Sequence, residues 1–293
     1  MLILGAGHSG TSTLAGLVNQ SEACLCLFEV DFTEPRQGKY RARYEKKFPG
    51  WDYLFGKQVG IDWSLSQLSQ YGPWQFIGTK VQELRFDLLE ADVNFLLCTS
   101  RTPASWLSHP STFQAYNIKA NAISVACDYV LFIDKAIRKG AHLFSLEALY
   151  ADPDSWPIKL ASIIPNWVPA SQNWWEHMDA NQDQFKASAN WLRAHPSATR
   201  QPEDYRQPLN FKPGTAIDEV FGAFESLNTT GRPVPLTVEK RAKLEALRKL
   251  PGKSIEDLVI SEDPLLPSLL SPPPLRISLQ DRIYSKFFRA RWR

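Results

Sequence analysis

The stretch ILGAGHSGTSTL, residues 3–14, constrains the fold more than any other part of the chain. A short apolar run leads into Gly5, Gly7 and Gly10, and a helix-like pattern follows at residues 13–19. Glycine-rich turns between a strand and a helix allow the backbone to approach a ligand, and the N–H groups at the start of the helix favour anions. The stretch therefore predicts a strand, a phosphate-binding loop and a helix.

Five short apolar runs in the sequence are typical of buried parallel strands. They are Leu2–Leu4, Ala23–Phe28, Gln75–Gly78, Asn94–Cys98 and His142–Ser145. A loop and helix-like periodicity follow each run. This alternation predicts an α/β fold, a three-layer sandwich with a central parallel sheet, in which ligands bind at the carboxyl ends of the strands.

The composition is that of an ordinary globular protein, with 44% hydrophobic residues, 22% charged residues and a net charge of +2. Without a basic excess, we expect no nucleic-acid partner. The cysteines have no metal-binding spacing, so we expect no metal and reduced thiols in the core. Neither a signal peptide nor a membrane-spanning run is visible, which favours the cytoplasm. The four cysteines are Cys24, Cys26, Cys98 and Cys127.

The chain is expected to form one α/β domain over residues 1–260, with the strand motifs in 1–165 and a helical, Trp-rich part in 166–260 that packs on the core. An aromatic-rich insertion over 31–73 could cap the sheet edge. Residues 261–276 have five prolines and predict a linker without helix or sheet. Residues 277–293 predict a basic helix that docks on its own domain or contacts a membrane surface.

The three glycines also spell G-x-G-x-x-G, the dinucleotide fingerprint, and Glu29 follows where an acidic residue would meet a ribose hydroxyl. The residues after Gly10 argue against this interpretation. A dinucleotide-binding helix begins with small apolar side chains, whereas Thr11, Ser12 and Thr13 present hydroxyls suited to a phosphate monoester. An FAD- or NAD(P)-dependent oxidoreductase stays open as an alternative.

The same loop has the G-x-x-x-x-G spacing of nucleotide kinases between Gly5 and Gly10. A kinase loop needs a lysine directly after the last glycine, to reach the transferred phosphate. Thr11 occupies that place, which argues against an ATP kinase or a GTPase.

Four stretches, in this order, resemble motifs of the sulfotransferase family, whose members transfer a sulfuryl group from 3′-phosphoadenosine 5′-phosphosulfate (PAPS). GAGHSGTSTL is similar to the family's loop G-x-x-[RK]-S-G-T-[TS], and FEVDF looks like the E-V-x-F-F segment of heparan-type members. FIGTKVQEL supplies a lysine after the third strand. FLLCTSRTPASWLSH resembles the strand-loop-helix for the 3′-phosphate, and LFSLEALYADPDSWPIKLASIIP is similar to the downstream x-Y-E-D-L-x-x-D-P segment.

The resemblance covers residues 1–165 and implies a P-loop NTPase-like fold with helical insertions covering the acceptor side. It implies that Glu29 is the catalytic base, with Asp31 as the fallback, and that Lys80 and His8 act on the migrating group. The implied 3′-phosphate ligands are Arg101 and Ser108. The implied ligands of the 5′-phosphosulfate are Gly7, His8, Ser9, Gly10, Thr11, Ser12 and Thr13. The acceptor would be a small molecule or a carbohydrate with a hydroxyl or amine.

The chemistry of the side chains points the same way, although each also has an ordinary structural explanation. An ammonium such as that of Lys80, at the end of an apolar strand, is costly unless it faces an anion. A guanidinium such as that of Arg101 forks readily onto a phosphate. The ordinary explanations are an exposed lysine, a surface carboxylate at Glu29 and a loop histidine bonded to the backbone at His8.

Two positions depart from the family pattern. His8 stands where most members have Arg or Lys, so its charge is weaker at neutral pH. Ser108 is seven residues after Arg101, whereas the family's helix serine comes eight residues on. One position is about 100° around a helix, so either the turn at Pro103 is shorter or Ser108 is not the ligand. A catalytically silent, nucleotide-binding homologue is therefore the third hypothesis.

Overall fold

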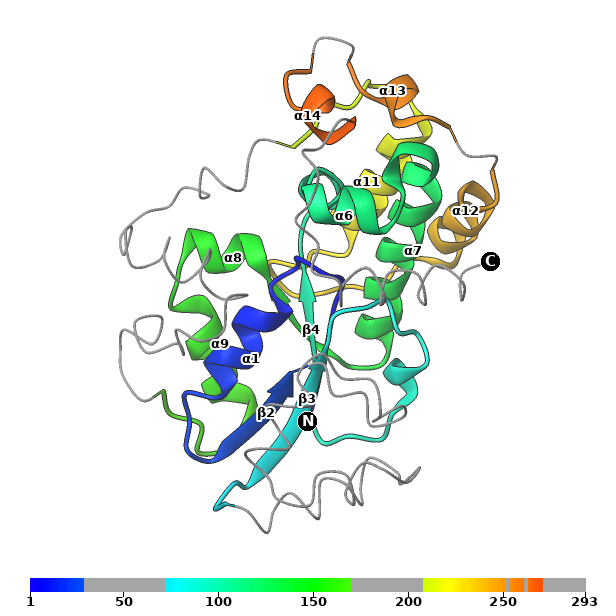
Figure 1. Ribbon diagram of the computed structural model, residues 1–293. Coiled ribbons are helices and arrows are strands. Elements are labelled where there is room, and N and C mark those ends of the chain that lie inside the picture. Colours follow the sequence, from blue (N-terminus) through cyan, green and yellow to red (C-terminus); the bar gives the residue numbers. More distant parts are fainter. Residues whose placement is uncertain (29–71, 170–207, 251–252, 261–262, 271–293) are drawn as a thin grey trace, which may run out of the picture.

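The computed structural model describes residues 1–28, 72–169, 208–250, 253–260 and 263–270. Five strands form one sheet in which every pairing is parallel (Figure 1). The order across the sheet is β2-β3-β1-β4-β5. The predicted α/β class with a central parallel sheet is confirmed. The strands are β1 (Leu2–Leu4), β2 (Cys24–Phe28), β3 (Phe76–Val81), β4 (Leu96–Ser100) and β5 (His142–Ser145).

The observed strand ends differ from the predicted ones at β3 and β4. Apolar character predicted ends at Gly78 and Cys98, whereas the strands continue to Val81 and Ser100. The polar residues near these ends are buried, and the ladder to the neighbouring strand runs through Thr79 and Lys80 in β3 and through Thr99 and Ser100 in β4. Lys80 therefore lies within β3 rather than after it.

The position of β1 distinguishes this sheet from the dinucleotide-binding fold. The chain leaves β1, passes through α1 (Thr11–Val18) and forms β2 at the edge of the sheet, with β3 between the two strands. In the dinucleotide-binding order, 3-2-1-4-5-6, the second strand lies next to the first. Here β3 and β4 flank β1, so their carboxyl ends flank the loop that follows it.

Helices cover both faces of the sheet, as its sequence pattern requires. Successive side chains of a strand point to opposite faces, so Leu2 and Leu4 join one buried cluster and Ile3 joins the other. The cluster around Ile3 includes side chains of α1, α8 (Leu146–Ala151) and α9 (Ser155–Ile163), which lie to the left of the sheet in Figure 1. The long helix α7 (Ile118–Arg138) belongs to the other cluster.

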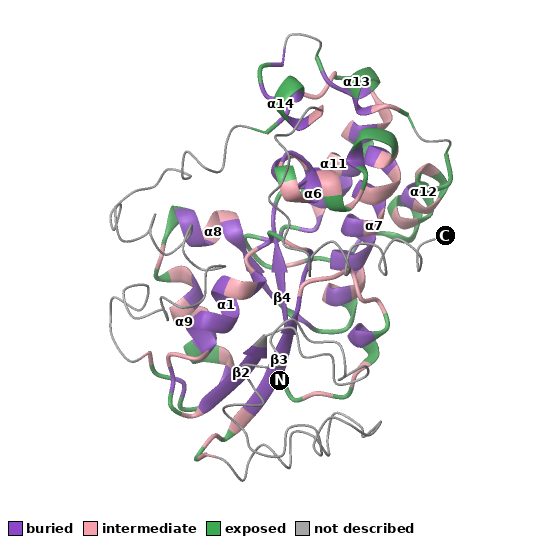
Figure 2. Ribbon diagram, in the orientation of Figure 1, coloured by how far each residue is buried: buried purple, intermediate pink, exposed green. Residues whose placement is uncertain are grey.

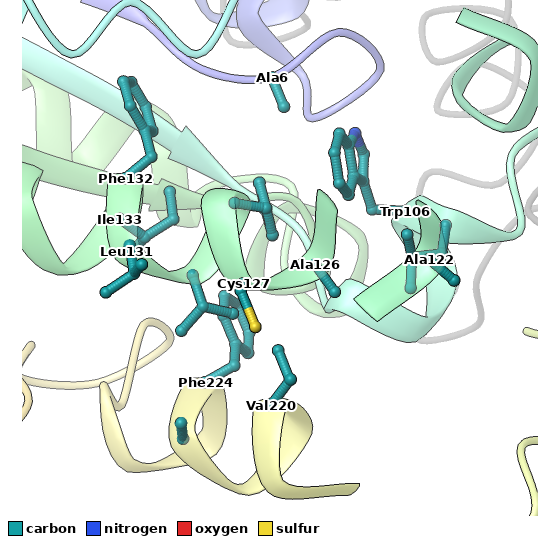
Figure 3. Close-up of a cluster of buried hydrophobic side chains, with 14 of the residues drawn as sticks. Ala6, Trp106, Ala122, Ala126, Cys127, Leu131, Phe132, Ile133, Val220 and Phe224 are labelled. Carbon is teal, nitrogen blue, oxygen red and sulfur yellow. The ribbon is translucent and has the colours of Figure 1, made fainter. Parts of the chain in front are cut away.

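The described part of the predicted helical region packs on α7. Val220 and Phe224 of α11 (Ala216–Ser226) are buried and face Cys127 of α7 (Figure 3). Beside them lie α12 (Val238–Arg248) and α13 (Ile255–Leu258), and α12 keeps a largely exposed outer face (Figure 2). The shorter elements before α7 are the 3₁₀ helix η3 (Leu88–Glu90), α5 (Pro103–Leu107) and α6 (Pro110–Ala115).

The prediction of a linker without helix or sheet is wrong for residues 263–270. A short helix, α14 (Leu266–Leu270), forms there, and Leu266 and Leu269 are buried in the core. The carboxylate of Asp263 accepts hydrogen bonds from the N–H groups of Leu265 and Leu266, which satisfies the start of the helix. Pro267 lies in the first turn, where its missing N–H costs nothing. Residues 271–293, including the predicted basic helix, lie outside the described residues.

All four cysteines are buried and unpaired, as predicted. Burial raises the pKa of Cys26 and Cys127 to about 12, so their thiols stay protonated at neutral pH. Of the described helices, none combines the length and the apolar character needed to cross a bilayer.

Candidate functional site

The loop between β1 and α1 requires glycine at two positions, for different reasons. Gly10 has a φ of 96° and precedes the first residue of α1. At Gly5 the close approach of neighbouring side chains matters instead, because a Cβ there would overlap the hydroxyl of Thr99. His8 also has a positive φ, 64°, which is uncommon for a residue with a side chain. The loop is therefore a tight turn fastened against β4.

The hydroxyl residues of the loop divide into structural and accessible groups. The Oγ of Ser9 donates to the carbonyl of Ala6 at 2.7 Å and lies 2.7 Å from Oγ1 of Thr99, so Ser9 fastens the loop to β4. Thr11 and Thr13 are buried, whereas Ser12 is partly exposed. Of the predicted hydroxyl ligands, Ser12 is thus the one whose side chain reaches the carboxyl edge of the sheet at Lys80.

Lys80 lies opposite Ile3 of β1 and Phe28 of β2, in the middle of three adjacent strands. The residue is fully buried, and its ammonium donates to Oγ of Ser12 at 2.8 Å and to Oε1 of Gln82 at 3.1 Å. A buried ammonium is costly without polar partners, and here those include the first turn of α1. The structure therefore places the Lys80 ammonium beside the first turn of α1.

Arg101 approaches the loop from the other side, directly after β4. It is 3% exposed, and its Nη1 donates to the carbonyl of His8 at 3.3 Å. Its Nε donates to Oγ of Ser105 at 2.8 Å. We call the loop Gly5–Gly10, Ser12, Lys80 and Arg101 the loop site, since contacts join all of these parts.

The structure does not bring Ser108 to Arg101. The Ser108 hydroxyl donates to the carbonyl of Ala104 at 2.6 Å and accepts from the N–H of Leu209 at 2.8 Å. These bonds join α5 to the segment before α11. The hydroxyl that contacts Arg101 belongs to Ser105, four residues on, which is about one helical turn. That spacing is the signal that could have identified Ser105 from the sequence.

His8 and His109 form a stacked pair at the loop, with ring centroids 3.9 Å apart and an angle of 17° between the planes. His8 is exposed to solvent at one side, although protein surrounds much of the ring. Desolvation, followed by the charges of Arg101 and Lys80, lowers the pKa of His8 to about 4. Desolvation and the neighbouring His8 and Arg101 lower the pKa of His109 to about 3. Both imidazoles are therefore neutral at pH 7.

Two aromatic side chains that the sequence analysis missed form hydrogen bonds with the backbone of the loop site. Trp106 donates from Nε1 to the carbonyl of Gly7 at 2.8 Å. The hydroxyl of Tyr129 is hydrogen-bonded to the backbone on both sides of Arg101. Nothing in the local pattern around Tyr129 marks it, because its position on α7 fits an ordinary core residue.

Glu29, the predicted base, lies outside the described residues, as does Asp31. Glu29 directly follows Phe28, the last residue of β2, which is paired with Lys80. The described residues contain no cluster of three or more His, Cys, Asp or Glu side chains that could hold a metal ion.

The chemistry available at the loop site is that of anion binding. Two buried cations, Lys80 in β3 and Arg101 directly after β4, lie beside the loop and the N-terminus of α1. The first N–H groups of this helix precede its first intrahelical bond, from Leu14 to Gly10. A comparison of the chain with protein-family models found no matching model, and a comparison with curated proteins found no match.

Proposed function

We propose that this chain is a sulfotransferase that transfers a sulfuryl group from PAPS to the hydroxyl or amine of an acceptor. The observation that carries the proposal is the pair of buried cations at one loop. Lys80 is 2.8 Å from Ser12 at the start of α1, and Arg101 is 3.3 Å from the carbonyl of His8. A co-substrate with phosphates at both ends of a ribose needs two such cationic contacts close together.

The proposed chemistry asks little covalent work of the protein. Sulfuryl transfer, like phosphoryl transfer, is an in-line displacement driven by positioning and by donors aimed at the migrating group. The loop N–H groups and Lys80 would bind the 5′-phosphosulfate, and Arg101 would bind the 3′-phosphate. Glu29 would take the proton from the acceptor as the new S–O or S–N bond forms and the bond to the leaving phosphate breaks.

The strand order supports this proposal over a dinucleotide-dependent oxidoreductase. In the dinucleotide-binding fold the strands on either side of the first one are the second and the fourth. Here they are β3 and β4, and each carries a buried cation at its carboxyl end. A Rossmann-type FAD or NAD(P) enzyme is correspondingly disfavoured.

His8 favours a second candidate, a catalytically silent homologue that binds the nucleotide without turnover. The cation that most sulfotransferases have at this loop position is replaced by a side chain whose pKa is lowered to about 4. A neutral imidazole stabilises the developing negative charge of the leaving phosphate less than an Arg or Lys does.

Calorimetric titration with adenosine 3′,5′-bisphosphate tests binding. Lys80→Met and Arg101→Met should each weaken the affinity roughly a hundredfold, because each removes a charge-assisted contact worth about 3 kcal/mol. Lys135→Met is the matched control, since Lys135 is a partly buried lysine of α7 that donates to the carbonyl of Phe86 and forms an ion pair with Glu90. No binding by the wild-type protein, or equal binding by the two site variants and the control, would refute the proposal.

Radiolabelled PAPS with pooled acceptors separates turnover from binding. Glu29→Gln should abolish transfer and leave the bisphosphate affinity within about twofold, because the base acts on the acceptor and not on the nucleotide. If the wild-type protein binds the bisphosphate but transfers no sulfate to any acceptor, the silent homologue becomes the better description.

A further inference from the structure

Two buried aromatic rings that contact the backbone of the loop site stack on each other. Trp106 comes from α5 and Tyr129 from the middle of α7, and both are fully buried. Their ring centroids are 4.4 Å apart, with an angle of 18° between the planes. Trp106 lies beside the loop at Ala6 (Figure 3).

Each ring carries one polar group, and each polar group bonds to a different half of the loop site. Nε1 of Trp106 donates to the carbonyl of Gly7 at 2.8 Å. The hydroxyl of Tyr129 accepts from the N–H of Arg101 at 2.7 Å and donates to the carbonyl of Arg101 at 2.7 Å. The stack therefore joins the loop to the peptide groups on both sides of the arginine.

The stack continues away from the loop site into the helical region. Phe224 of α11 lies on Tyr129, with centroids 6.0 Å apart and an angle of 20° between the planes. Tyr116 packs edge-on against Trp106 at 5.2 Å. Side chains in a protein core are close-packed and move little relative to one another. The contact with Phe224 therefore fixes the position of the Tyr129 ring relative to α11.

We propose that Trp106 and Tyr129 are positioning residues that set the distance between the two anion-binding halves of the loop site. Trp106 orients the loop through Gly7, Tyr129 orients Arg101 through its backbone, and the contact between the rings fixes one relative to the other. The inference rests on the proposed function for the identity of the ligand, a 3′,5′-bisphosphate. The direction of an arginine side chain follows its backbone, so a small rotation at Arg101 displaces the guanidinium much further.

The test compares three conservative variants in the full-length chain. Trp106→Phe and Tyr129→Phe each remove a polar group and keep a ring in the stack. Trp167→Phe is the matched control, because Trp167 is also buried and its Nε1 also donates to a backbone carbonyl, that of Val18, at the other end of α1. Affinities for adenosine 3′,5′-bisphosphate and adenosine 5′-phosphate are measured by calorimetry, well below the melting temperature of each variant.

Tyr129→Phe should weaken binding of the bisphosphate roughly tenfold and that of the 5′-phosphate little, because only the arginine half is disturbed. Trp106→Phe should weaken both ligands roughly tenfold, because both need the loop. Trp167→Phe should stay within about twofold of the wild type for both ligands. A merely structural role would lower stability in all three variants without this pattern, and affinities like those of Trp167→Phe would overturn the inference.

Hydrogen exchange measured by mass spectrometry tests the positioning without a ligand. Faster exchange of residues 5–10 in Trp106→Phe, and around Arg101 in Tyr129→Phe, supports the inference, and exchange equal to that of Trp167→Phe overturns it. If the wild-type protein binds neither nucleotide, the proposed function fails, while the exchange data still decide whether the stack positions the loop and the arginine.

Discussion

The loop site and the contact between α7 and α12 both bury charged side chains, but the buried charges have opposite signs. At the loop site the buried charges are the cations of Lys80 and Arg101, whose contacts include hydroxyl, amide and carbonyl oxygens. At the helix contact, the fully buried Asp134 accepts from Arg138 and Arg241 at 3.0 Å each, and from the N–H of Leu236 at 2.8 Å.

The difference teaches what each arrangement is suited to do. A buried carboxylate can hold guanidiniums from two helices at once, whereas two buried cations at one loop form a site suited to an anion. The cluster at Asp134 therefore joins α7 to α12, and the loop site gathers two cations beside the N-terminus of α1. Each of the following three changes separates stability from ligand binding in a different way.

Asp134→Ala should give the largest loss of stability, about 3 kcal/mol, because it leaves the Leu236 N–H unsatisfied and two arginines without their carboxylate. Urea unfolding measures this change. Asp134→Asn keeps an acceptor for Leu236 and should recover about 1 kcal/mol. The bisphosphate affinity of either variant should stay within about twofold of the wild type. A large loss of affinity would show that the helix contact and the loop site are coupled.

Gly10→Ala should lower the free energy of unfolding by about 2 kcal/mol, for two reasons. A residue with a Cβ is strained at a positive φ, and the added Cβ would lie too close to neighbouring side chains. That Cβ would lie 2.9 Å from Cη2 of Trp156 and 3.0 Å from Cδ1 of Leu146. Gly140→Ala is the control, since Gly140 has a φ of 75° with no atom within 4 Å of its added Cβ, and it should cost about 1 kcal/mol. The bisphosphate affinity should fall for Gly10→Ala alone; equal losses of stability in the two variants would contradict the close contacts at Gly10.

Acidification should destabilise the unliganded loop site by the smallest amount. The pKa values of His8 and His109 are lowered in the folded protein, to about 4 and about 3, from an ordinary value of 6.5. Between these values the unfolded chain binds more protons, so the stability from these histidines, present above pH 6.5, is lost as the pH falls toward 4. The effect should be small, because His8 is exposed and salt screens its charge. On acidification to pH 5, we expect the Tm of the wild type to fall by only about 2 °C more than the Tm of the His8→Asn/His109→Asn variant.

Saturating bisphosphate should narrow the difference between the two proteins, since a bound anion favours the protonated imidazoles. Scanning calorimetry over pH 5–8, with and without the ligand, makes the measurement. A wild-type protein whose Tm rises relative to the double variant on acidification would contradict the assigned direction of these pKa shifts.

Much of the fold could be predicted from local patterns. The apolar runs at Leu2–Leu4 and His142–Ser145 coincide with β1 and β5, because strands buried on both faces need continuous apolar sequence. The patterns failed where packing overrides composition. Residues 263–270 read as a proline-rich linker, yet Leu266 and Leu269 bury against the core and Asp263 caps the helix that carries them.

The sequence by itself determined the class of fold, the place of the loop and the two cations that flank it. Glycine spacing, apolar runs and charge at strand ends are local properties that survive in any packing of the chain. Only the tertiary structure decided the order of the strands, the choice of Ser105 over Ser108 at Arg101, and the contact of Trp106 and Tyr129 with the loop site. These depend on which residues far apart in the chain meet, and packing geometry sets that.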